Sequence, residues 1–201
     1  MIYRNITLLL FILISNTISF AQNNKWVQKK NKSGVIIHSR ENEATGNIEF
    51  KASITLNTNI DNVLSVFNDV AGFTNWMTDT KISKTLKKNS DTESYIYFEA
   101  EVPWPLENRD MPLFQKIIKT NKGIKIIWTG KPDYITHKKG ITRIEEAIGS
   151  WVFIPVSKNK IIVKYQFVAD PGLNIPNWII NLFIVDGPYQ TLLNLKEIVE
   201  Q

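Results

Sequence analysis

The feature that most constrains the fold is the strict alternation in residues 47–56, NIEFKASITL. Every second residue is apolar: Ile48, Phe50, Ala52, Ile54 and Leu56. In an extended chain these positions share one face, and the polar residues between them share the other. One apolar face and one polar face are typical of an antiparallel sheet that packs on one side only.

Strand patterns recur along the chain and are separated by short polar or glycine-containing connections. They predict strands at about residues 81–88, 92–102, 111–119, 123–129, 143–155 and 160–169. A short helix is predicted at 59–70, because apolar residues there follow helical spacing and Thr58 with Asp61 forms a capping-box-like start.

The last segment is predicted to be helical from Pro176 to about Val199. From Ile175 to Val185 it is apolar nearly all round, which indicates burial on several sides or a cover over an apolar site. Pro188, after Gly187, removes a backbone hydrogen bond and predicts a kink. The resulting fold class is α+β: a long antiparallel sheet around a C-terminal helix, with room for a pocket between them.

Residues 1–21 have the pattern of a secretory signal peptide, with Arg4, an apolar run and Ser19-Phe20-Ala21 before the cleavage point. A membrane anchor is the alternative, but the apolar run is shorter than the roughly 20 residues of a spanning helix. We therefore predict one mature domain, residues 22–201, exported to the periplasm or the outside. The chain has no cysteine, so its stability depends on the core and not on disulfides.

The formal net charge of +5 is spread along the chain, and no dense Lys/Arg run predicts a nucleic-acid partner. The charge fits a weak attraction to anionic lipid headgroups at a membrane surface. Nothing in the pattern predicts an oligomer, so we expect a monomer.

Catalytic signatures are absent from the sequence. His38 and His137 lie far apart, no metal-ligand spacing occurs, and no phosphate-binding or dinucleotide motif is present, so no catalytic residue, metal or cofactor is predicted. Arg143 and Glu145 fall on one strand face, where we expect them to form an ion pair.

The predicted strand at 92–102 has two different faces. Tyr95, Tyr97, Glu99 and Glu101 alternate with Ile96, Phe98, Ala100 and Val102. We expect the aliphatic face to point inward. The opposite orientation would place a phenol and a carboxylate in the pocket.

The stretch VPWPLENRD (102–110) ends that strand, because neither proline can donate to a strand ladder. Trp104 lies either over the pocket mouth or as a cap on the core. Arg109 and Asp110 are adjacent on an extended chain and point apart, so they are not expected to pair with each other. We expect Arg109 to hold a carboxylate or loop carbonyls, with ligand contact as the alternative.

Several stretches together resemble the StAR-related lipid-transfer (START) family, in its exported bacterial form: GVIIHSR (34–40), FTNWM (73–77), PWPLENRD (103–110) and ADPGLNIPNWIINLFIVDGPYQTLLNLKEIV (169–199). The resemblance implies a helix-grip fold with a hydrophobic tunnel that holds one lipid or similar apolar molecule. It also implies that the C-terminal helix and a loop, here residues 130–140, form a lid. The residues expected to contact the ligand are Phe98, Trp104, Arg109, Trp128, Trp151, Phe167, Trp178, Leu182 and Phe183.

The sequence departs from sterol-carrying members at one position. Those members have an arginine six residues after the Arg-Asp pair and an acid on the preceding strand. Here the sixth residue after Arg109 is Gln115, although Glu99 or Glu101 could supply the acid. Sterol is therefore not the expected ligand.

Three functions remain open from the sequence. The first is an exported protein that binds and transfers a lipid without catalysis. The second is an enzyme like the polyketide aromatases and cyclases of related helix-grip proteins, with Arg109, Tyr97 and Glu99 as its candidate residues. The third is an interaction module whose core is filled and has no usable pocket.

Overall fold

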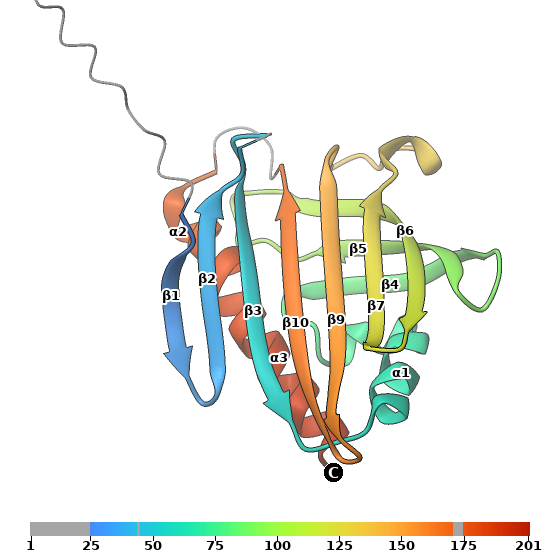
Figure 1. Ribbon diagram of the computed structural model, residues 1–201. Helices are drawn as coiled ribbons and strands as arrows, with labels where there is room; N and C mark the ends of the chain where they lie inside the picture. The colour runs from blue at the N-terminus through green and yellow to red at the C-terminus, as the bar shows by residue number, and fades with distance from the viewer. Residues whose placement is uncertain (1–24, 44, 171–174) are drawn as a thin grey trace, which may run out of the picture.

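A ten-stranded antiparallel sheet dominates the computed structural model, which describes residues 25–43, 45–170 and 175–201 (Figure 1). Its strands are β1 (Val27–Lys32), β2 (Val35–Glu41), β3 (Ile48–Leu56), β4 (Thr80–Lys88), β5 (Glu93–Ala100), β6 (Asn108–Thr120), β7 (Gly123–Gly130), β8 (Ile141–Arg143), β9 (Ala147–Ser157) and β10 (Lys160–Ala169). The predicted signal peptide lies outside the described residues.

The strands are ordered β1-β2-β3-β10-β9-β7-β6-β5-β4, and β8 pairs in parallel with the start of β6. The sheet curls, so that β4 and β5 run behind the strands at its centre and enclose the helix α3 (Gly187–Val199) (Figure 1). The helix packs against β2 and β3. This is the predicted helix-grip arrangement, and below we call the face toward α3 the inner face.

The C-terminal helical segment has three parts. A short helix α2 (Asn177–Asn181) leads into a π-helical turn (Leu182–Asp186), and α3 follows. Pro188 lies in the first turn of α3, directly after the π turn, and has no N–H to donate to the carbonyls of that turn. The predicted interruption at Gly187-Pro188 is therefore present, and the interrupted part is a π turn before the proline. No helix of the described residues is long and apolar enough to span a membrane.

Two parts of the sheet differ from the sequence prediction. The β1–β2 hairpin was not predicted, because β1 is an edge strand with mostly exposed polar residues and therefore shows no apolar period. The strand predicted at 143–155 is two strands, β8 and β9, since the chain turns at 144–146. Glu49, expected on the solvent face, is buried and accepts a hydrogen bond from Arg40.

One end of the interior is filled by aromatic side chains. Phe67 of α1 (Ile60–Asn68) lies edge-on to Trp151 and Phe153, with ring centroids 5.0 and 5.1 Å apart. Trp76 and Phe73, from the turn after α1, complete this cluster. Stacked and edge-to-face rings of this kind fill space at high density. The unfilled space lies toward the other end of the grip.

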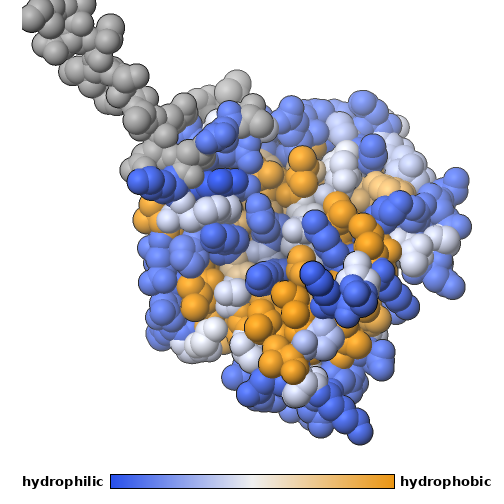
Figure 2. All heavy atoms as spheres, in the orientation of Figure 1, coloured by the Kyte–Doolittle hydropathy of each residue, from blue (hydrophilic) through white to orange (hydrophobic). Residues whose placement is uncertain are grey.

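The outer face of the sheet is mostly polar, but it carries apolar side chains on β9 and β10. Ile154 and Ile162 are paired across these strands and half-buried, and Val156 is exposed. Figure 2 shows orange patches on this face between blue side chains.

Candidate functional site

A cavity of about 400 Å³ lies between the sheet and the C-terminal helical segment. Its walls come from β3, β4, β5, β6, β7 and β10, from the loops beside them, and from α2, the π turn and α3. The lining residues are Gly46, Asn47, Ile48, Phe50, Met77, Thr78, Asp79, Thr80, Phe98, Glu99, Ala100, Arg109, Met111, Leu113, Trp128, Ile144, Tyr165, Phe167, Ala169, Ile175, Ile180, Phe183, Ile184, Gly187, Pro188 and Thr191. Most of them are apolar. The interior is therefore not filled throughout, as the hypothesis of an interaction module without a usable pocket would require.

Five of the nine residues expected to contact a ligand line this cavity: Phe98, Arg109, Trp128, Phe167 and Phe183. Phe98 lies on the aliphatic face of β5, which points inward as predicted. Phe183 comes from the π turn and forms part of the helical cover.

The other four expected residues lie elsewhere. Trp104 is 91% exposed on the turn between β5 and β6, and Trp178 is 57% exposed on α2. Trp151 is fully buried, but it stacks on Tyr165 at 3.8 Å within the aromatic cluster, below the cavity. Leu182 belongs to the π turn and is outside the lining, because Ile180 and Phe183, three residues apart, share the helix face toward the cavity.

The sequence prediction missed several lining residues. Met111 and Leu113 lie on the same face of β6 as Arg109, and Tyr165 lies on the same face of β10 as Phe167. The two-residue period of a strand would have found these three from the residues already chosen. Asp79 had no such signal, because it precedes β4 in a short connection.

Arg109 is the cation of the cavity wall. Its side chain is buried, with 8% of the residue exposed, and Nη1 donates to the carbonyl of Glu107. This agrees with the expected contact to a loop carbonyl. Nε is buried without a hydrogen-bond partner, and burial lowers the pKa of the guanidinium below its ordinary value, although it stays charged at neutral pH.

Asp79 is an acid of the same wall. Its φ of 58° is in the left-handed region, where residues other than glycine are uncommon. Its Oδ2 is buried without a partner and faces Gly187, since a Cβ on that glycine would lie 3.7 Å away. Burial, and then repulsion from Glu101, raises the pKa of Asp79 above its ordinary value.

Gln115 lies on the inner face of β6, where sterol-carrying relatives would have an arginine. Its Oε1 accepts a hydrogen bond of 2.9 Å from Trp128 Nε1, and its Nε2 is 3.5 Å from the hydroxyl of Ser94, the paired residue on β5. Both groups are neutral. The structure therefore supplies no charged pair at this position.

A cluster of polar side chains is buried on the opposite face of β5 and β6. The Tyr97 hydroxyl lies 3.1 Å from Asp110 Oδ2 and 3.3 Å from Glu99 Oε2, and Arg143 pairs with Asp110. The expected ion pair of Arg143 with Glu145 is therefore wrong, since the guanidinium is turned toward β6. Burial, followed by the charge of Asp110, raises the pKa of Tyr97 well above its ordinary value.

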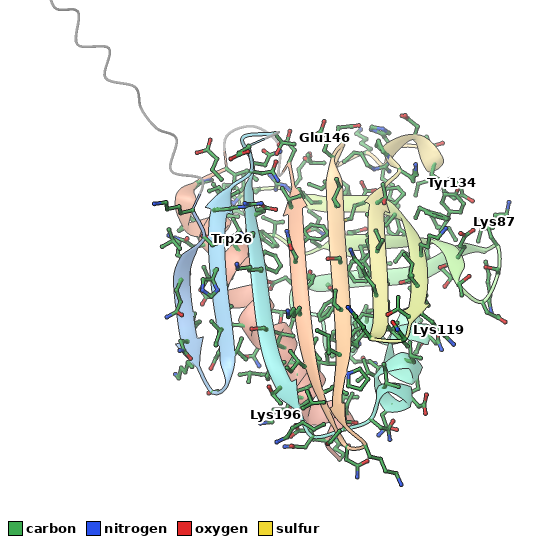
Figure 3. All side chains as sticks on the ribbon, in the orientation of Figure 1. Trp26, Lys87, Lys119, Tyr134, Glu146 and Lys196 are labelled. Atoms are coloured by element: carbon green, nitrogen blue, oxygen red, sulfur yellow. The ribbon has the colours of Figure 1, made fainter. Side chains whose placement is uncertain are left out.

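The loop expected to act as a lid covers this outer cluster. Tyr134 stacks on Tyr95 with ring centroids 3.8 Å apart, and Lys138 Nζ lies 2.6 Å from the Tyr97 hydroxyl. Figure 3 shows Tyr134 at the edge of the sheet, away from α3. None of residues 131–140 lines the cavity. Loop and helix residues that line the cavity come instead from 46–48, 77–80, and Ile175, Ile180, Phe183 and Ile184.

The three residues of the enzyme hypothesis do not converge in the cavity. Tyr97 is not among the lining residues. Glu99 borders the cavity as Arg109 does, but its carboxylate is bound by Asn108 and Lys138 in the outer cluster. Among the described residues, no group of His, Cys, Asp or Glu is arranged to hold a metal ion.

Comparisons with known proteins agree with this architecture. No family model matches the sequence. A crystal structure of a STAR-related lipid transfer protein from Xanthomonas axonopodis is 33% identical, covers 88% of this chain and 99% of its own, and superposes with a TM-score of 0.78. The chain belongs to the StAR-related lipid-transfer family.

Two further START proteins extend the comparison. Phosphatidylcholine transfer protein of Rattus norvegicus is 24% identical over 174 residues, which is 81% of this chain and 78% of that protein. Human StAR-related lipid transfer protein 5 is 14% identical, covers 92% of this chain and 89% of its own, and has a TM-score of 0.74. At that identity the human protein supports the fold alone. The START helix-grip fold is thus shared across bacterial and mammalian members.

Proposed function

We propose that this START protein is an exported lipid carrier that holds one apolar molecule in the cavity beneath α2, the π turn and α3. The main support for this proposal is the cavity itself, which has a volume of about 400 Å³ and walls mostly of aliphatic and aromatic side chains. Such a volume is within the range of small-molecule sites. The names of the Xanthomonas and rat relatives, which refer to lipid transfer, support the same class of ligand.

Native mass spectrometry tests this proposal. Protein isolated from its own compartment is expected to carry one apolar small molecule per chain, and the empty protein is expected to take up a fluorescent fatty acid in a saturable titration. Five residues are proposed to contact the ligand: Phe98, Arg109, Trp128, Phe167 and Phe183. A protein that is always empty and gives no saturable signal would overturn the proposal.

Exchange of the ligand with a membrane is proposed to use two exposed tryptophans near the cavity. Trp104 lies on the turn that joins Ala100 to Arg109, and Trp178 lies two residues before Ile180; Ala100, Arg109 and Ile180 line the cavity. Tryptophan is enriched at the membrane–water interface, where its ring is apolar and its N–H remains hydrated.

A vesicle experiment tests this membrane contact. The variant with Trp104→Ala and Trp178→Ala is expected to co-sediment less with vesicles and to transfer lipid more slowly, while still binding ligand. Trp26→Ala is the control, because the Trp26 ring is covered by Arg40 of β2 and Lys51 of β3 and Trp26 does not line the cavity (Figure 3). Equal co-sedimentation of both variants and the parent would show that the two tryptophans do not contact the membrane.

Export is proposed from the first 21 residues. The intact mass of protein recovered from the periplasm or the medium is expected to begin at Gln22, and size-exclusion chromatography with light scattering is expected to show a monomer. Full-length protein retained in the cell would contradict the proposed export, but not the ligand cavity.

A further inference from the structure

Arg109 and Asp79 form a charged end of the mostly apolar cavity and have no charged partner. The third ionisable lining residue, Glu99, differs from them because its carboxylate is bound by Asn108 and Lys138. No ion pair joins either side chain to a charged group among the described residues. Each side chain has a buried atom without a hydrogen-bond partner, Nε of Arg109 and Oδ2 of Asp79. A buried charge that lacks a partner is destabilising, so native proteins normally pair it. The missing partners are therefore a property of the site to be explained.

The two side chains lie at the same end of the cavity because three neighbouring strands hold them there. Thr80 on β4 is paired with Ala100 on β5, and Ala100 is paired with Arg109 on β6. Asp79 precedes Thr80, and its carbonyl accepts a hydrogen bond of 2.8 Å from Glu101 N. Two strand spacings separate the backbones by about 10 Å. A headgroup of a few heavy atoms can span the gap that remains between a long arginine and a short aspartate.

The size of the cavity restricts the apolar part of the ligand. A cavity of about 400 Å³ is at the lower end of the range of small-molecule sites, roughly 300–1,000 Å³. This size favours a ligand with one acyl chain over a ligand with two.

We propose that the cavity takes a single-chain amphiphile whose headgroup carries both an oxyanion, bound by Arg109, and an N–H or O–H donor, bound by Asp79. This rests on the proposed lipid-carrier function and names the class of its ligand. The guanidinium supplies charge-assisted hydrogen bonds to a phosphate or carboxylate. A carboxylate without partners favours a primary ammonium or hydroxyl over a quaternary ammonium, which has no hydrogen to donate. The raised pKa of Asp79 agrees with a carboxylate that lacks its partner.

Three probes of one chain length separate the contributions: a fatty alcohol, a fatty acid and a lysophosphatidylethanolamine. They share the apolar chain, but only the last two have an oxyanion and only the lysophospholipid combines it with an ammonium. The parent protein is expected to bind the lysophospholipid most tightly and the alcohol most weakly. If no probe saturates, the lipid-carrier proposal itself fails; if all three bind equally, only the headgroup inference fails.

Two variants then assign the contacts. Arg109→Gln is expected to weaken both anionic probes by about ten- to a hundredfold, the usual effect of a hydrogen bond to a charged group, and to change alcohol binding little. Arg109→Lys keeps the charge and should retain the preference for anionic probes, which controls for folding. Asp79→Asn should weaken the lysophospholipid and strengthen the fatty acid, because it removes a negative charge near the oxyanion.

The test is decisive because Asp79→Asn is expected to change the affinities for the lysophospholipid and the fatty acid in opposite directions. A purely structural role for Arg109 would weaken all three probes alike, and a purely structural role for Asp79 would shift the lysophospholipid and the fatty acid in the same direction. Either result would overturn the inference.

Discussion

Arg143 and Asp110 form a two-pronged buried ion pair that joins β8 to β6. Arg143 Nε lies 2.6 Å from Asp110 Oδ1 and Nη2 lies 3.0 Å from Oδ2, with the two side chains 2% and 1% exposed. Nη1 also donates to the carbonyls of Pro132 and Ile135. One guanidinium thus fixes both the loop after β7 and the parallel pairing of β8.

Removing that guanidinium is expected to destabilise the protein strongly. Arg143→Met leaves Asp110 buried and charged, which typically costs about 3 to 5 kcal/mol of unfolding free energy. Urea unfolding measures the change. Lys116→Met, at the half-exposed pair with Glu93, is the control and should cost less than about 1 kcal/mol. The double variant Asp110→Leu with Arg143→Met should recover part of the loss; a double variant worse than the single one would contradict the buried-charge explanation.

Phe183→Asp is expected to abolish saturable ligand uptake. Phe183 lines the cavity, and an unpaired carboxylate there costs several kcal/mol or takes up a proton. Leu182→Asp is the matched control, because Leu182 belongs to the same π turn but not to the lining. A fluorescent fatty-acid titration, with melting temperatures for both variants, checks the prediction. Normal uptake by the Phe183 variant would exclude this residue from the binding wall.

Gly149→Ala is expected to reduce the cavity. A Cβ at this position would lie 2.6 Å from Phe167 Cδ2 and 3.4 Å from Trp128, and both rings line the cavity. Relieving the clash requires the Phe167 ring to move, and overpacking of this kind typically costs about 1 to 3 kcal/mol. Weaker probe binding and a lower unfolding free energy are expected together. Unchanged affinity would show that the ring moves away from the ligand.

The stability of the protein is expected to depend on pH through Asp79. Because the folded-state pKa of Asp79 is raised above its unfolded value of 3.8, ionisation costs more in the folded protein. This contribution is favourable below pH 3.8 and is lost as the pH rises through the folded-state pKa. As the pH rises from 3.8 through the folded-state pKa, the unfolding free energy of Asp79→Asn should therefore increase relative to that of the parent. A constant difference between the two proteins from pH 3 to 7 would refute it.

Strand alternation predicts which side chains point inward, but not which of them line the cavity and which are packed in the core. The two-residue period placed Phe98 on the inward face, whereas Trp128 and Trp151 were expected from the resemblance, which did not distinguish cavity from core. The difference is made by Phe67, which reaches Trp151 from α1 and closes that end. Such a contact depends on how the short helix packs, and no periodicity in the strand carries that information.

Polar positions were the hardest to predict, because their partners come from distant parts of the chain. Asp110 was correctly separated from Arg109, yet its partner Arg143 lies 33 residues further on. Tyr97 was expected either in the pocket or on the surface, but it is buried beneath Lys138. Asp79 gave no sequence signal, since only the packing of α3 places Gly187 opposite its carboxylate.

The π turn at Leu182–Asp186 gives the cover of the cavity a spare residue. A π turn holds one residue more than the α-helical turn it replaces, and each residue of an α-helix advances by about 100° around the axis. Absorbing that residue into regular helix would rotate α2 by about this angle, without a change in the hydrogen bonds of α3. The position of Ile180 at the cavity would then be taken by its neighbour Ile179 or Asn181. One sequence would thus present two registers of the same helix to ligands of different width.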